Sequence, residues 1–529
     1  MTTQRSFAKG WPTGRRPVPA AISLAAALLI GGCQTTGIGS ALDRANPFTE
    51  TYEQVDGKLI DDIGKGEWSP PALGEDDSAP KAVVVPDGET MLRTLSDGLV
   101  SDQEMNRYLN EVAERLLAHS PITNAPVQIK VTSTESYDAA IAMPDGVIGI
   151  PIGMLRDVEN EDQLAFVIGH EISHVLLGHH DIEWIGRFQG HLVGMADVGI
   201  GTVKGLSEKL PSGTVDTGRV ERYARVADLT WQVTRDVFLT SWSRKQEDEA
   251  DLLGMDLMTA AGYNGTEAIE FFNRYVAWLE QQREKTPPED DAGAEDDVAA
   301  KMGESTSVWD MALAAGETGL QSARARLKER HRDVEARRDS LDEYFAREYE
   351  DLELPAVSTE SFLARRRQSQ DVFDAYSAAK DVSDALDAER MEDARRYSLR
   401  AVSGATGRDG AVRLARYRVR LAEKKVAKAR ENLLIALREP GAGLPVYKRL
   451  IESYVAEGDK EGAFEVVRKA WGDLGAIMPL YPFMIYFTAQ TGDVRATNEL
   501  VTGCRIAFRE YLERCQEAAA GTLNTKESG

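Results

Sequence analysis

The pentapeptide His170-Glu171-Ile172-Ser173-His174 constrains this chain more than any other segment. An α-helix turns once every 3.6 residues, so His170 and His174 share one helical face and both imidazoles can reach one tetrahedral metal ion. Glu171 lies one position further round the helix, where it can accept a proton from water without binding the metal. The spacing predicts a hydrolytic site with one Zn²⁺ per chain.

The surrounding residues predict a buried helix rather than a loop. An apolar run over 164–168 leads into the pentapeptide, and more apolar residues follow it. Asn160 with Gln163 three residues later has the pattern of a capping box, and Gly178 can end the helix. The alternative is that the pentapeptide occurs by chance. Because the chain has only seven histidines in 529 residues, the probability of such a coincidence is small.

A catalytic zinc site needs a third protein ligand. His179 and His180 follow His174 by five and six residues, off its face, and we interpret them as residues of the helix end. Glu247 is a better candidate, because it precedes Asp251 by four residues in a second predicted helix. One carboxylate of such a pair can bind the metal while the other holds a ligand imidazole. Alternatively, the acidic run is a solvated helix face.

Taken together, residues 170–174 and 243–251 resemble the gluzincin peptidases of the HtpX and BepA type. The resemblance implies three zinc ligands, a general base and a carboxylate that orients the first ligand. By this resemblance the zinc ligands are His170, His174 and Glu247, the general base is Glu171, and the carboxylate that orients His170 is Asp251. It also implies that peptide bonds are the substrate.

Two further segments resemble the same family. Residues 142–150 are similar to the strand and turn before the active-site helix, where an edge strand can pair with an extended substrate, although Asp138 replaces a common asparagine. His331 resembles a histidine that approaches the zinc as a regulatory plug or fourth ligand, with an arginine six residues later. Arg332 replaces the usual proline there, and a solvated histidine in a charged helix is the alternative.

Residues 1–32 predict a lipoprotein signal peptide. A basic start precedes an apolar run over 20–30, which is too short to span a bilayer comfortably. The run ends in Ile30-Gly31-Gly32-Cys33, which resembles a bacterial lipoprotein cleavage box in which Cys33 receives lipid. Gln34 is typical of outer-membrane lipoproteins, whereas a conventional signal peptide is the alternative. We expect a lipid-anchored protein of the cell envelope, facing the periplasm.

The net charge of −24 disfavours nucleic acid as a partner and electrostatic binding to anionic lipid. The N-terminal lipid is therefore the expected membrane contact.

Besides Cys33 the chain has Cys504 and Cys515. Residues 505–514 have a helical pattern, and an unbroken helix would hold these two cysteines about 16 Å apart. We expect two unpaired thiols unless a turn intervenes.

The sequence predicts a mainly α protein, in which an α+β metallopeptidase domain with a small sheet precedes a helical repeat domain. Expected elements include a helix near 103–118 and strands near 127–132 and 147–150. Residues 182–240 suggest a lid, groove or packed helix pair, and 286–306 an acidic loop. The expected division is a signal peptide over 1–32, a flexible tether over 33–85, the peptidase over 86–345, a connection over 346–368, repeats over 369–520 and a tail over 521–529.

Alanines within helical patterns recur at intervals of 33 to 35 residues in the last third of the chain. They are Ala394, Ala429, Ala463 and Ala496. Gly458-Asp459 and Gly492-Asp493 mark equivalent turns. A period near 34 is typical of tetratricopeptide repeats, and a plain helical bundle is the alternative.

Two functions follow from these parts. The first is a zinc endopeptidase that degrades misfolded or misassembled envelope proteins, which dock on the repeats. The second is a periplasmic chaperone or assembly adaptor for outer-membrane proteins, which engages their assembly machinery through the repeats and whose peptidase site is normally autoinhibited. The first is favoured because a scaffold has no chemical need for Glu171.

Overall fold

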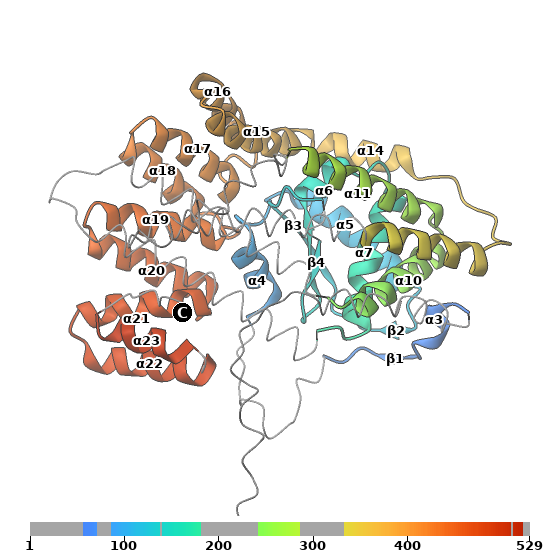
Figure 1. Cartoon of the computed structure of the whole chain (residues 1–529), viewed down its shortest axis with the longest axis horizontal. Coiled ribbons are helices and arrows are strands. Elements are labelled where there is room, and N and C mark those ends of the chain that lie inside the picture. The colour runs from blue at the N-terminus through green and yellow to red at the C-terminus, as the bar shows by residue number, and fades with distance from the viewer. Residues whose placement is uncertain are drawn as a thin grey trace, which may run out of the picture. The chain divides into compact units, whose positions relative to one another are not determined.

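The computed structural model describes residues 57–70, 86–137, 140–180, 242–285, 333–508 and 511–521. Helices predominate in these ranges, which confirms the predicted mainly α fold (Figure 1). No helix among the described residues is both long and apolar enough to cross a membrane. Several predictions concern positions outside these ranges: Cys33, Asp138, His331 and the segments 182–240 and 286–306.

A three-stranded sheet lies at the centre of the N-terminal part, with strand order β3-β5-β4. β3 (Gln128–Thr132) runs parallel to β5 (Val147–Pro151). β4 (Ile141–Ala142) pairs antiparallel with the other side of β5. Every residue of β5 is buried, as expected for a central strand covered on both faces. Both predicted strands are confirmed, but β4 rather than β5 is an outer strand.

Among the described residues, the helices that accompany the sheet are α4 (Gly88–Leu95), α5 (Gln103–Leu117), α6 (Ile152–Asp157), α7 (Glu161–Leu176), α10 (Arg244–Ala260) and α11 (Thr266–Lys285). The predicted start of α7 is confirmed, since the Asn160 side chain accepts a hydrogen bond from the Gln163 N–H at 2.9 Å. Gly178 has a φ of 66° just beyond its end. Ser243 and Gln246 form a capping box at the start of α10.

α7 and α10 lie side by side (Figure 1) and approach most closely at a pair of glycines. A Cβ on Gly254 would lie 2.8 Å from the backbone nitrogen of His170. A Cβ on Gly169 would lie 3.1 Å from the Gly254 carbonyl oxygen. Because neither residue has a side chain, the two backbones can meet. This crossing brings the first turns of α10 next to the pentapeptide.

Residues 57–70 pack on the part of the chain that contains the sheet, so the flexible tether predicted over 33–85 is wrong for this segment. α3 (Leu59–Asp62) is followed by β1 (Gly66–Glu67), which pairs in parallel with β2 (Ile122–Thr123). Composition alone predicted a solvated linker, because the segment is rich in small and polar residues.

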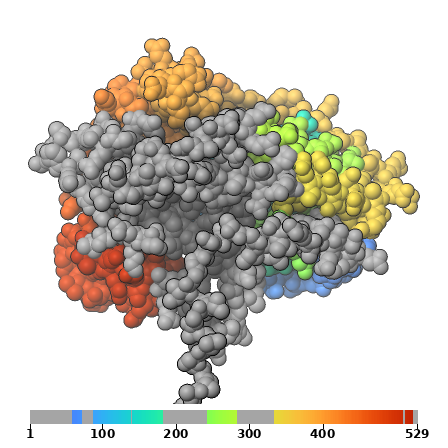
Figure 2. All heavy atoms as spheres, viewed as in Figure 1, coloured from blue at the N-terminus to red at the C-terminus, as the bar shows by residue number. Residues whose placement is uncertain are grey.

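Polar contacts from its backbone and from one tryptophan hold this segment in place. The Ile60 N–H donates to Asp256 Oδ2 at 2.9 Å, and the Trp68 indole N–H donates to the Val175 carbonyl at 3.1 Å. Figure 2 shows the segment in blue beside the green and yellow atoms of the later chain. These contacts tie it to both helices that carry the candidate site.

The C-terminal part consists of helices that pack as consecutive pairs (Figure 1). After α14 (Thr359–Gln368), the pairs are α15 (Gln370–Asp387) with α16 (Met391–Ala401), α17 (Gly410–Ala422) with α18 (Val426–Ala436), α19 (Leu444–Ala456) with α20 (Lys460–Leu474), and α21 (Tyr481–Gln490) with α22 (Val494–Ala507). The short η1 (Met478–Leu480) precedes α21, and α23 (Leu512–Ala519) follows α22.

The turn inside each pair has the same backbone conformation. Glu389, Lys424, Gly458 and Gly492 have φ values of 56°, 60°, 77° and 80°. They therefore place a left-handed residue between the two helices every 34 or 35 residues, although glycine occupies only the last two positions. The four recurring alanines all lie in the second helix of a pair. The first three are fully buried, and Ala496 is half-buried.

α4 packs against these C-terminal helices, although the sequence placed it in the peptidase domain. Met91 and Leu92 belong to the same apolar cluster as Tyr447. The Arg93 guanidinium donates to the carbonyls of Ala442 and Asp473 at 3.0 and 3.1 Å. The two parts of the chain therefore share a core through α4.

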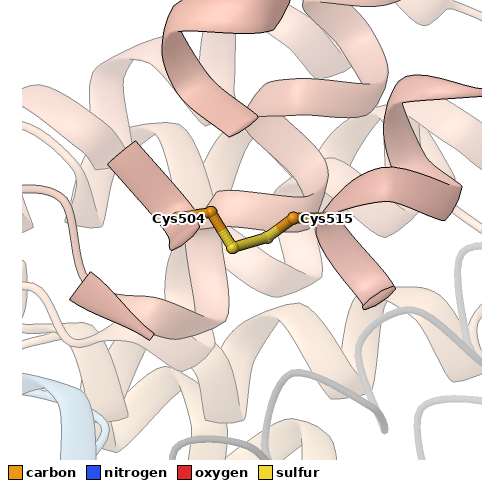
Figure 3. The surroundings of a disulfide bond; sticks show 2 residues. All are labelled: Cys504 and Cys515. Atoms are coloured by element: carbon orange, nitrogen blue, oxygen red, sulfur yellow. A yellow bond between two sulfur atoms is a disulfide. The ribbon is translucent and has the colours of Figure 1, made fainter. Parts of the chain in front are cut away.

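Cys504 and Cys515 form a disulfide, so the expectation of two unpaired thiols is wrong (Figure 3). That expectation assumed an unbroken helix over 505–514. Instead α22 ends at Ala507, the chain turns, and α23 begins at Leu512. The turn brings the two Cα atoms to 6.6 Å, within the usual range for a disulfide.

Candidate metal centre

His170, His174 and Glu247 converge at the crossing of α7 and α10. Each offers a ligand atom within 4.8 Å of the others. The two histidine Nε2 atoms lie 3.2 Å apart. Glu247 Oε2 and Oε1 lie 3.7 and 3.8 Å from the Nε2 atoms of His170 and His174, respectively. A tetrahedral zinc with bonds near 2 Å holds its ligand atoms about 3.3 Å apart, so these residues fit such an ion.

A carboxylate and an arginine support the first histidine and the glutamate. Asp251 Oδ1 lies 2.9 Å from His170 Nδ1, which leaves Nε2 facing the other ligands. The Arg337 guanidinium forms a two-pronged contact with Asp251, at 2.7 and 2.8 Å, and a third contact with Glu247 Oε2 at 2.7 Å. Arg337 comes from a helical segment over 333–348. Its positive charge holds the pKa of buried Asp251 below its usual value despite burial, which alone would raise that pKa.

The second histidine is held differently. His174 Nδ1 lies 2.8 Å from His179 Nδ1, and His179 Nε2 lies 3.4 Å from Glu249 Oε2. The Trp242 ring stacks on the His174 ring at 4.2 Å between centroids. His179 and His180 therefore lie just beyond α7, as expected, but both are buried and both have partners. His180 Nε2 donates to the Ala142 carbonyl at 2.9 Å.

Glu171 is buried beside the ligand cluster, and burial raises the pKa of its carboxyl to about 7. The Ala142 N–H of β4 donates to this carboxyl and acts in the opposite direction, lowering its pKa. The outer strand β4 is thus attached to the pentapeptide helix through Glu171 and to the following residues through His180. A buried carboxyl group with a raised pKa, next to side chains that could bind a metal, is a candidate for proton transfer.

The ligand cluster opens into a pocket of about 150 Å³. Its described lining combines the polar side chains of His170, Glu171, Glu247 and Arg337 with aromatic and aliphatic side chains. Asp333 and Trp242 also contribute. A reacting group in this pocket would therefore lie next to both the ligand atoms and Glu171.

Comparison with known proteins agrees with this geometry. Residues 103–336 match the model of Peptidase family M48. These residues form an M48 peptidase domain. The predicted resemblance to BepA-type peptidases is confirmed at the level of this domain, which contains the three candidate ligands. Arg337 lies one residue beyond the matched range.

Several named relatives are similar to part of the chain. The chain is 23% identical over 218 residues to the beta-barrel assembly-enhancing protease of Escherichia coli (strain K12), covering 38% of this chain and 39% of that relative. It is 26% identical over 141 residues to metalloprotease YcaL of the same strain, covering 27% and 48%. Metalloendopeptidase OMA1, mitochondrial, of Danio rerio is 26% identical over 95 residues, covering 17% and 20%. The chain spans less than half the length of each of these relatives.

Sequence reasoning missed two supporting residues of the M48 site. It noted an arginine six residues after His331 without giving Arg337 a contact, and it assigned no role to His179. Neither lies at a helical spacing that points to the ligands. His179 reaches the site because α7 ends at Leu176, and Arg337 reaches it because the 333–348 segment packs beside α10.

Proposed function

We propose that this chain is a zinc-dependent endopeptidase that cleaves misfolded or misassembled proteins of the cell envelope. The observation that carries the proposal is the convergence of two imidazoles and a carboxylate next to buried Glu171. A site with this donor set suits zinc, because imidazole nitrogen and carboxylate oxygen are ligands that zinc accepts in catalytic centres. The M48 domain around it supports peptide-bond hydrolysis.

His170, His174 and Glu247 would hold the metal, and Asp251 and Arg337 would keep His170 and Glu247 in place. When bound, zinc supplies a Lewis acid that polarises a carbonyl and makes water more acidic. Glu171 then accepts the proton of the attacking water and later delivers it to the departing amine. Because Glu171 is buried at the pocket wall, bulk water competes little for that proton.

The place of action and the clients are part of the same proposal. The predicted lipoprotein segment with Cys33 and the likeness to the beta-barrel assembly-enhancing protease support a lipid-anchored envelope protein, held at the outer membrane and facing the periplasm. The four helix pairs with their recurring left-handed turns support a tetratricopeptide-like array. Such an array offers surfaces on which client segments can dock.

The test is the substitution Glu171→Gln, which keeps the shape of the side chain and removes the proton acceptor. We expect cleavage of casein to fall at least a hundredfold while the zinc content stays near one per chain. Glu104→Gln, on the exposed side of α5, is the matched control and should retain full activity. Undiminished cleavage by Glu171→Gln would refute the mechanism.

A second candidate is an assembly adaptor for outer-membrane proteins, which the helix pairs favour. In this function the repeats bind the assembly machinery, and proteolysis is secondary. If this function is correct, cells that lack the protein recover normal envelope assembly when supplied with the Glu171→Gln variant. If the peptidase proposal is correct, these cells do not recover. Removing the C-terminal helices is a poor alternative test, because α4 shares their apolar core.

A further inference from the structure

Two neighbouring arginines on α17 have no acidic partner among the described residues. Arg413 and Arg416 are three positions apart, so their side chains leave the same face of the helix. Three arginines around them each pair with a glutamate at 2.6 or 2.7 Å: Arg395, Arg408 and Arg420. α17 itself contains no acidic residue. In a chain with 86 acidic and 62 basic residues, two adjacent arginines without a carboxylate need an explanation.

Neutral oxygen atoms are the hydrogen-bond partners of these two guanidinium groups. Arg416 Nη1 donates to Ser398 Oγ of α16 at 2.7 Å, and Arg413 Nη1 donates to Asn432 Oδ1 of α18 at 3.2 Å. The Nε–H of Arg413 is buried and has no partner within the described part of the chain. Arg416 is only 5% exposed. Both positive charges therefore lie where α17 packs against α16 and α18 (Figure 1).

The surrounding charges do not balance these arginines. Burial, together with neighbouring arginines, lowers the pKa of both guanidinium groups. Glu423 is the carboxylate that acts on Arg416, but it already contacts Arg395, Arg420 and Lys425 at 2.7, 2.7 and 3.1 Å. A buried charge without a counter-charge is unfavourable, and a carboxylate supplied from outside would relieve it.

We propose that Arg413 and Arg416 bind the carboxylate side chains of an acidic segment of another polypeptide. A planar guanidinium group can donate two parallel hydrogen bonds to one carboxylate. Leu399 on α16 and Leu434 on α18 are 50% and 38% exposed, so the helices on both sides of α17 also offer apolar contacts. A peptide can use these contacts, whereas an inorganic anion cannot. This site is separate from the metal centre and does not depend on the proposed peptidase activity.

The position of the arginines favours a peptide over a membrane surface. Because Arg416 is almost fully buried, a single carboxylate side chain can approach it more closely than a layer of lipid headgroups can. The net charge of −24 opposes contact with a large anionic surface. For a short peptide the local charge matters more, since charges further away than about 8 Å are screened at physiological ionic strength.

A binding measurement on the full chain tests the proposal. The probe is a short labelled peptide that contains aspartate, glutamate and leucine and has an amidated C-terminus. Its matched partner carries asparagine and glutamine in place of the acidic residues. We expect fluorescence anisotropy at physiological ionic strength to show at least tenfold tighter binding of the acidic peptide. Equal affinities for the two peptides would overturn the proposal.

The combined substitution Arg413→Gln and Arg416→Gln should remove this preference. Its matched control is Arg468→Gln with Arg495→Gln, which removes the same charge from arginines of α20 and α22 that are 52% and 90% exposed. The control should bind the acidic peptide like the wild type. An equal loss of binding in both double variants would show that only the total charge matters and would refute the site.

Asn432→Asp provides a second test, which does not require removal of a buried arginine. It keeps the shape of the side chain and places a carboxylate where Asn432 Oδ1 now accepts from Arg413. This internal carboxylate should compete with the peptide and weaken its binding at least fivefold. Asn498→Asp, on the exposed side of α22, is the matched control and should bind normally. Unchanged binding in folded Asn432→Asp would contradict the proposal even if the arginine variant does not fold.

Two further outcomes would assign the arginines to a different occupant. Vesicles of phosphatidylglycerol that displace the acidic peptide and bind more tightly than it does would indicate a lipid ligand. Peptide binding that appears only in a variant combining Glu289→Gln, Asp290→Asn and Asp291→Asn would indicate that an acidic stretch of this chain occupies the site. Either result would overturn the assignment to another polypeptide.

Discussion

His174 Nδ1 lies 2.8 Å from His179 Nδ1, so one candidate metal ligand is supported by a second imidazole rather than by a carboxylate. If Nε2 of His174 faces a metal, its proton resides on Nδ1 and is donated to His179. His179 must then keep its own proton on Nε2, which faces Glu249 Oε2 at 3.4 Å. The three side chains form a relay that fixes the tautomer and the ring orientation of His174.

His179→Ala should weaken zinc binding by about ten- to a hundredfold, the usual effect of removing a group that orients a ligand. The dissociation constant can be measured by competition with a chromogenic chelator, without any substrate. His119→Ala, an exposed histidine beyond α5, is the control and should bind zinc like the wild type. Identical affinities for both variants would show that the relay does not support the metal.

His179 shows why part of the site could not be predicted. A histidine five residues after a ligand points away from that ligand as long as the helix continues. In the structure α7 ends at Leu176, and Gly178 turns the chain in a left-handed conformation, which returns His179 to His174. The glycine was recognised as a stop signal, but the direction of the chain after it depends on packing against α10.

The convergence of the candidate ligands was predictable because their signals are local. The capping residues at Asn160 and Ser243 and the four-residue spacings within α7 and α10 define each helix separately. Arg337 illustrates the limit, because it contacts Asp251 across 86 residues of sequence. No periodicity within either segment encodes that contact. Two of the four repeating turns could be predicted, because Gly458 and Gly492 are typical turn residues. Glu389 and Lys424 occupy the other two turns and give no such signal.

Gly254→Ala should separate the two helices that carry the candidate ligands. Its new Cβ would lie 2.8 Å from the His170 backbone nitrogen, a contact that only a shift of α10 or α7 can relieve. Because Glu247 lies on α10 and both histidines lie on α7, we expect zinc affinity to fall more than tenfold.

Gly472→Ala on α20 is the matched control for this change, since nothing lies within 4 Å of its new Cβ. This helical substitution should raise the free energy of unfolding by about 0.5–1 kcal/mol and leave zinc binding unchanged. Chelator competition and urea unfolding provide the two measurements. Unaltered zinc affinity in Gly254→Ala would mean that the helix crossing tolerates a methyl group.

Replacing Cys504 and Cys515 together with serine should lower the free energy of unfolding of the C-terminal helices by about 2–4 kcal/mol. The disulfide closes a loop of 11 residues between α22 and α23, and both cysteines are buried. Urea unfolding followed by circular dichroism measures the loss. The wild-type protein under reducing conditions should unfold like the double variant, whereas a stability independent of both treatments would contradict the prediction.

Asp256 should make the stability of the protein depend on pH between about 4 and 6. Its buried carboxyl accepts hydrogen bonds from Tyr344, Tyr349 and the Ile60 N–H. Burial outweighs these contacts and raises the pKa of Asp256 to about 6. The folded protein therefore retains a proton that the unfolded chain releases above its ordinary pKa of 3.8.

Because the folded state binds that proton more tightly, the contribution of Asp256 to stability is greatest below pH 4. It falls by about 1.4 kcal/mol per pH unit until pH 6 and is constant above. Asp256→Asn removes the titration, so the difference in unfolding free energy between variant and wild type should shift by about 2–3 kcal/mol in favour of the variant from pH 4 to pH 7. Urea unfolding across this range measures it, with exposed Asp61→Asn as the control. Parallel pH curves for wild type and Asp256→Asn would contradict the prediction. They would show that Asp256 is ionised throughout this range, so that a carboxylate rather than a neutral carboxyl group lies where residues 57–70 contact α10.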